Sequence, residues 1–108
     1  MNQNTLRHLR KELAKLRGQA RGGIPSEKLE RFARSCGRNL SPRGKHPAWV
    51  SALLPKTDAT PLSIPHHSRP IYQVVANIIL ETLESDLDKL EERYAKSQEH
   101  QNTEERND

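Results

Sequence analysis

The sequence has few aromatic residues, a single cysteine and no long apolar run, and each shortage excludes a class of protein. Aromatic residues make up 4% of the 108 positions, which argues against a large enzyme pocket and against a stacking platform for single-stranded nucleic acid. The one cysteine, Cys36, can form neither an internal disulfide nor an all-cysteine metal site. No apolar run approaches the roughly 18 residues of a membrane span. The first residues also lack the apolar segment of a secretory signal, so we expect a cytoplasmic protein that does not contact a membrane.

The charge of the chain divides into two halves of opposite sign. Residues 1–56 carry 13 Lys and Arg against 3 Asp and Glu, whereas residues 57–108 carry 5 against 11. This split favours a basic surface for an anionic partner, of which nucleic acid is the commonest. Two other interpretations stay open: helical faces that are merely solvated, and an acidic tail that covers the basic half or binds a basic partner.

Hydrophobic spacing predicts two helices before residue 37. In residues 1–23, apolar residues recur every three or four positions and basic residues cover the other faces, which predicts a basic amphipathic helix capped by Thr5. That stripe consists of Leu6, Leu9, Leu13, Leu16 and Ala20. Its apolar side would lie on the domain or on a partner, which includes a second copy of the chain. A second helix is predicted from Ser26, as N-cap, to Cys36, with Gly37 ending it and Cys36 in the core.

Short strands and one long helix are predicted after Gly37. The strand candidates are residues 38–41, 48–54 and 62–64, the last two bounded by prolines. Ser68 and Pro70 suit the start of a helix that becomes acidic after Leu83 and extends to about residue 96. Its predicted apolar stripe is Ile71, Val75, Ile78, Ile79, Leu83, Leu87, Leu90 and Tyr94. Residues 97–108 lack periodicity and are expected to be disordered.

This order predicts an α+β domain at residues 24–96, preceded by the extra N-terminal helix and ending in the extended acidic helix. The elements after residue 23 follow as α-β-β-β-α, and an antiparallel three-stranded sheet covered by helices satisfies that order.

Two polar clusters could carry chemistry. The first is Arg43-Gly44-Lys45-His46, where glycine allows close approach of a ligand, Arg and Lys can hold a phosphate, and His can move a proton. The second is His66-His67, which follows the third strand candidate. RNA cleavage by a 2′-hydroxyl needs a base, an acid and a cation for the transition-state charge, and no metal. A zinc site from His46, His66 and His67 is disfavoured because adjacent histidines on an extended segment point in opposite directions.

These motifs resemble those of the HicA toxins, small ribonucleases of bacterial toxin–antitoxin modules. The matches are Gly44-Lys45-His46 and Ile64-Pro65-His66-His67, in the family's order, within a stretch from about residue 26 to 83. The resemblance implies a fold like that of double-stranded-RNA-binding domains and mRNA cleavage without a cofactor. It also implies a HicB-like antitoxin as partner and a catalytic role for His46, whereas His66 and His67 match a structural signature of the family. The residues expected to contact RNA phosphate are Arg43, Gly44, Lys45, His66 and His67. Lys45 departs from the serine of many members, the second hairpin is longer, and residues 1–22 and the acidic end are additions.

Three functions therefore remain to be compared. The first is a HicA-like endoribonuclease in which His46 is base or acid and Arg43 and Lys45 hold phosphate. The second is a non-catalytic RNA-binding module, in which the same residues only position the backbone. The third is a helical interaction protein, in which the first and last helices pair within a chain or between chains.

Overall fold

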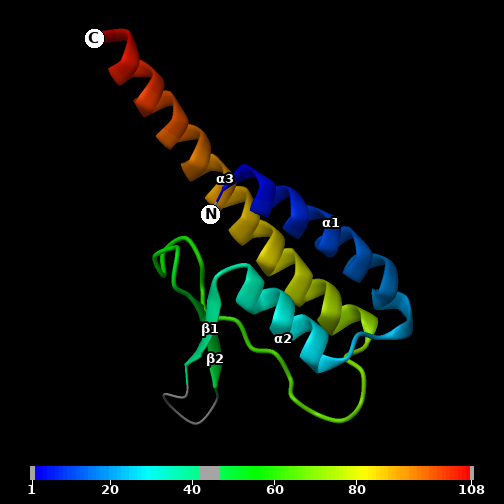
Figure 1. The fold of residues 1–108 in the computed structure, drawn as a ribbon. Helices are drawn as coiled ribbons and strands as arrows, with labels where there is room; N and C mark the ends of the chain where they lie inside the picture. The colour runs from blue at the N-terminus through cyan, green and yellow to red at the C-terminus, as the bar shows by residue number, and fades with distance from the viewer. Residues whose placement is uncertain (1, 42–46, 108) are drawn as a thin grey trace.

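The computed structural model describes residues 2–41 and 47–107, which form three long helices and a small sheet (Figure 1). The helices are α1 (Gln3–Gln19), α2 (Ser26–Ser35) and α3 (Gln73–Asn107). A 3₁₀ turn, η1 (Ala20–Gly22), follows α1. The strands β1 (Arg38–Ser41) and β2 (Ala48–Ser51) pair antiparallel. The predicted α+β class is confirmed. Within the described ranges, no helix combines the length and the apolar composition that crossing a bilayer requires.

Helix α1 lies along α3, and its apolar stripe faces the body of the protein (Figure 1). All five predicted stripe residues are buried, because the 3–4 spacing places them on one side of the helix. Three ion pairs border the contact: Arg10 with Asp88 and Glu91, and Arg17 with Glu84. The apolar side of this helix is thus covered by α3 of the same chain. The cap is Asn2, not Thr5: the Thr5 N–H donates to Asn2 Oδ1 at 2.8 Å.

Helix α2 follows the prediction closely at its C-terminal end. Its apolar side, including Cys36, is fully buried. Gly37 has a φ of +97°, and a Cβ there would lie 2.5 Å from Leu53 Cδ1, so glycine is required for the chain to leave the helix. The predicted cap at Ser26 is wrong. Pro25 occupies the cap position, and the Ser26 hydroxyl instead donates to the carbonyl of His67.

Helix α3 begins later than predicted. Ile71, assigned to the helix from its spacing, is extended and forms an antiparallel bridge with Ile24, each N–H donating to the other carbonyl at 2.7–2.9 Å. The first helical residue is therefore Gln73. The stripe contains a second error, because Ile78 is 56% exposed while Ala76 and Leu80 are buried. The helical backbone continues into residues 97–107, where the sequence predicts a disordered tail.

The sheet has two strands, and β2 is shorter than the predicted 48–54. Ser51 ends it, since the Ser51 hydroxyl accepts the N–H groups of Leu53 and Leu54 in a turn. In the predicted third strand, Leu62 forms a single antiparallel bridge with Trp49, through two hydrogen bonds of 2.7 and 2.9 Å. This bridge holds segment 62–64 at the edge of β2.

A fully buried ion pair joins the sheet to α3. Arg38 Nε and Nη2 donate to the two carboxylate oxygens of Asp86 at 2.6 and 2.9 Å. Arg38 Nη1 donates at 2.8 Å to the carbonyls of Trp49 and Thr60. Each nitrogen of the guanidinium and each carboxylate oxygen therefore has at least one hydrogen-bond partner inside the core, and one guanidinium links β1, β2, the following loop and α3.

Candidate functional site

A pocket of about 570 Å³ lies where α2, the sheet and the segment after Leu62 meet. It is bordered by one wall from α2, by β1 and β2, and by the extended segment that carries the second polar motif. The lining residues are Glu30, Arg34, Leu40, Pro47, Trp49 and Ser63 to His66. Apolar and polar side chains share this surface, as in sites that bind an organic ligand with a charged group.

His66 and Glu30 form the closest polar pair in this pocket. His66 Nδ1 lies 2.9 Å from Glu30 Oε1. The Glu30 side chain is 14% exposed, whereas that of His66 is 75% exposed. The carboxylate is therefore held inside the wall of the pocket, and the imidazole stands in front of it, open to solvent. Such a pair can accept or release a proton at the imidazole.

Arg34 brings a positive charge to the same wall. Its guanidinium carbon lies 5.0 Å from the centroid of the Trp49 ring, within the range of a cation–π contact. Trp49 is only 2% exposed, so the ring supports the guanidinium and is not itself a surface for stacking. Glu30 and Arg34 are four residues apart, which places them on the same side of α2.

The local structure of segment 62–67 explains why His66 faces α2. Leu62 is hydrogen-bonded to Trp49 through the backbone, and the Ser26 hydroxyl donates a hydrogen bond of 3.2 Å to the carbonyl of His67. The segment is thus attached at both ends, with His66 between the two attachments. Pro65 restricts the backbone just before it.

The predicted site residues fall into two groups. Arg43, Gly44, Lys45 and His46 lie outside the described residues. Pro47, which follows His46 in the chain, lines the pocket. His66 lies in the pocket with it, so the second motif and the residue after the first motif border the same space.

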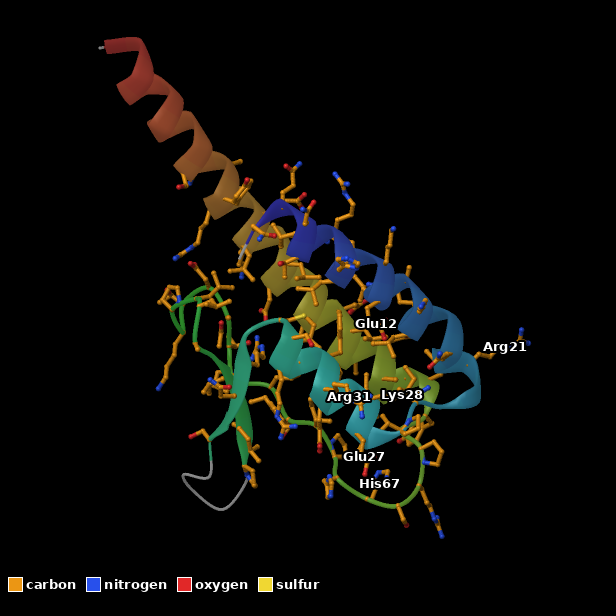
Figure 2. The ribbon with its side chains drawn as sticks, viewed as in Figure 1. Glu12, Arg21, Glu27, Lys28, Arg31 and His67 are labelled. Atoms are coloured by element: carbon orange, nitrogen blue, oxygen red, sulfur yellow. The ribbon has the colours of Figure 1, made fainter. Side chains whose placement is uncertain are left out.

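His67 does not line this pocket. It lies beside the first turn of α2, near Glu27, in a second hollow of about 500 Å³ (Figure 2). Its backbone ties the segment to Ser26, which gives His67 a structural role at this point. His66 borders both hollows, whereas His67 borders the second, so His66 is the histidine of this pair that lies beside Glu30 and Arg34.

Glu30 and Arg34 are the functional candidates that the sequence analysis missed. The sequence contains a weak signal for them: a carboxylate and a guanidinium four residues apart on the polar side of a predicted helix. Nothing local indicates that Glu30 meets a histidine 36 positions away.

Across residues 2–41 and 47–107, no cluster of three or more His, Cys, Asp or Glu side chains is arranged to hold a metal ion. No family model, no curated protein and no solved structure matches this chain.

Proposed function

We propose that this protein is a HicA-like endoribonuclease that cleaves mRNA, with the pocket between α2, β2 and residues 63–66 as the place where the RNA backbone binds. The observation that carries the proposal is that Pro47 and His66 line one pocket together with the cation of Arg34. The second motif and Pro47, the residue after the first motif, thus border one largely apolar pocket that also contains a cation and a histidine–carboxylate pair.

The arrangement of elements also supports the proposal. The described order is α2, β1, β2, the bridge at Leu62, and α3. With residues 62–64 as a third strand beside β2, this becomes the α-β-β-β-α order of double-stranded-RNA-binding domains. Such domains contact phosphates and 2′-hydroxyls across the minor groove, which suits a basic half of the chain.

In this proposal His46 transfers a proton in cleavage, and Arg43 and Lys45 contact the phosphates beside the scissile bond. The cleavage is intramolecular attack by a 2′-hydroxyl, a reaction that protein acid and base groups can catalyse by themselves. A HicB-like antitoxin in the cytoplasm would then inhibit the protein by covering the pocket.

The test is induction in bacteria of the wild type, of His46→Ala and of His8→Ala, with transcript cleavage mapped in the same cultures. His8 lies on α1, away from the pocket, and provides a matched control for the loss of a histidine. We expect growth arrest and cleavage with the wild type and His8→Ala, and neither with His46→Ala, because cleavage needs the proton transfer.

The alternative is an RNA-binding module without catalysis. That function would be indicated by folded wild-type protein that binds RNA, leaves transcripts intact at every concentration, and binds equally well after His46→Ala. Cleavage by the wild type would exclude it, and equal cleavage by wild type and His46→Ala would remove His46 from the reaction.

A further inference from the structure

We infer that His66 is the general base of the cleavage reaction, positioned by Glu30, and that Arg34 binds the scissile phosphate. The inference rests on the proposed ribonuclease function and assigns roles within its pocket. It gives three residues of the pocket a role in cleavage, and two of them, Glu30 and Arg34, belong to neither sequence motif.

The contact with Glu30 determines which nitrogen of His66 can act. An ionised carboxylate can only accept hydrogen bonds. At 2.9 Å, the proton between the two groups is therefore on His66 Nδ1. In the neutral ring this leaves the lone pair on Nε2, which is the atom available as a base. A carboxylate orients the base of a Ser-His-Asp triad in the same way.

Burial assigns different roles to the two members of this pair. The Glu30 side chain is 14% exposed, which makes it an acceptor with restricted movement and little access to substrate. His66, at 75% exposed, can contact RNA directly. Glu30 is accordingly a positioning residue, and His66 is the residue that touches the reacting atoms.

Arg34 supplies the cation that the transition state requires. Its guanidinium carbon lies 5.0 Å from the centroid of the Trp49 ring, and this cation–π contact favours a position at the pocket wall. The N–H groups of a guanidinium can donate in pairs to two phosphate oxygens, which lysine cannot do. A phosphate held there would lie in the pocket that His66 also lines.

The chemistry balances as a transesterification. His66 Nε2 accepts the proton of the 2′-hydroxyl while the 2′-oxygen forms a bond to phosphorus. The bond from phosphorus to the 5′-oxygen breaks, and its electron pair leaves with that oxygen, which takes a proton from an acid. In the proposed function that acid is His46. The products are a 2′,3′-cyclic phosphate and a 5′-hydroxyl, and neither water nor an oxidant enters the step.

The first experiment measures cleavage of an RNA oligonucleotide containing the mapped site by purified wild type, His66→Ala, His66→Gln and His8→Ala. At saturating RNA we expect both His66 variants to lose on the order of 10²- to 10⁴-fold in rate, while His8→Ala retains the wild-type rate. Circular dichroism spectra should match, because the His66 side chain is mostly exposed.

A second substrate distinguishes a base from an acid. Sulfur in place of the bridging 5′-oxygen makes a leaving group that needs no proton, so this RNA bypasses the acid. We expect it to restore cleavage by His46→Ala and not by His66→Ala. Added imidazole should restore part of the His66→Ala activity in proportion to its neutral fraction, which a purely structural role for His66 would not produce.

Glu30 and Arg34 have matched controls on the same helix. Glu30→Ala should slow cleavage more than Glu30→Gln, because the glutamine amide oxygen can still accept a hydrogen bond from His66 Nδ1–H. Glu27→Gln should have no effect. Arg34→Ala and Arg34→Lys should both reduce the rate at saturating RNA. Arg31→Ala should not, because Arg31 lies on the side of α2 that faces α1 (Figure 2).

Each outcome separates this inference from the proposed function. If wild-type protein binds RNA without cleaving it, both are wrong. If the wild type cleaves and His66→Ala cleaves equally, the inference is overturned while the ribonuclease function stands. Restoration of His66→Ala by the sulfur substrate would make His66 the acid and contradict its role as base.

Discussion

The buried pair of Arg38 and Asp86 is the residue-scale feature on which the sheet most depends. Replacing Asp86 with Asn removes the charge and turns an amide N–H₂ toward one guanidinium N–H, which leaves a buried cation without its counterion. We expect the free energy of unfolding to fall by about 3–5 kcal/mol, as when one partner of a buried pair is removed. Urea unfolding measures this loss.

The control for Asp86→Asn is Asp88→Asn, two residues along the same helix. Asp88 pairs with Arg10 but its side chain is 63% exposed, and exposed pairs contribute about 0–1 kcal/mol. Equal losses for the two variants would show that the Asp86 pair is not buried in solution.

The buried thiol of Cys36 should make the free energy of unfolding depend on pH in the alkaline range. Burial, with the nearby Asp86 carboxylate, raises the pKa of the Cys36 thiol to about 12, against 9.0 in the absence of these effects. Above pH 9 the folded chain therefore keeps the thiol proton, while the unfolded chain releases it. The contribution of the thiol to the free energy of unfolding is complete below pH 9 and is lost as pH rises toward 12. Relative to Cys36→Ala, the wild type should lose about 2 kcal/mol of unfolding free energy between pH 8 and pH 10.5.

Urea unfolding at several pH values tests the role of the thiol. Cys36→Ala also changes packing, but that change is the same at each pH, so only the pH dependence of the difference is interpreted. Two curves that stay parallel up to pH 10.5 would mean that the thiol is accessible to water in the folded protein.

At the scale of elements, the helices could be predicted because their signal is local. The 3–4 spacing of leucines in α1 and the glycine after α2 each lie within a few residues of the structure they specify. The errors arise where a distant partner intervenes. Ile71 fits the helical stripe, yet bonding to Ile24 holds it extended. Ile78 also fits, but the helices that cover α3 lie against other faces of it.

The third strand and the pocket were less accessible to prediction for the same reason. The spacing of Leu62 and Ile64 indicates an extended segment correctly, but pairing depends on how far the segment follows β2, and only Leu62 bridges. The partners Glu30 and His66 are 36 positions apart, and Arg38 and Asp86 are 48 apart. One local signal existed: Asp86 directly precedes Leu87 of the predicted stripe, three residues after Leu83, where a carboxylate requires a buried partner.

At the scale of the whole molecule, the two oppositely charged halves of the chain meet within it. Arg10 and Arg17 of the basic half pair with carboxylates of the acidic half along the contact between α1 and α3. Some of the opposite charges of the two halves therefore neutralise one another within the chain. A role for the basic half in RNA binding then depends on its remaining cations, including Arg34 at the pocket.

Helix α1 contacts the back of α2, whose other side forms the pocket wall, and it also reaches the pocket by a longer route through α3. Helix α1 packs on α3, α3 carries Asp86, Asp86 holds Arg38, and Arg38 bonds the carbonyl of Trp49 in the pocket wall. None of the residues that line the pocket comes from α1. Helix α1 should therefore stabilise the fold without taking part in cleavage.

Leu13→Ala tests this separation of stability from activity. Leu13 is buried in the core shared with α3, and truncation of a buried leucine costs about 2–5 kcal/mol because a cavity remains. We expect a lower thermal midpoint but a wild-type cleavage rate at temperatures where the variant is still folded. Lys15→Ala, exposed on the same helix, should change stability by less than about 0.5 kcal/mol. Wild-type stability of Leu13→Ala would mean that α1 does not pack on α3 in solution, and loss of cleavage by folded Leu13→Ala would make α1 part of the site.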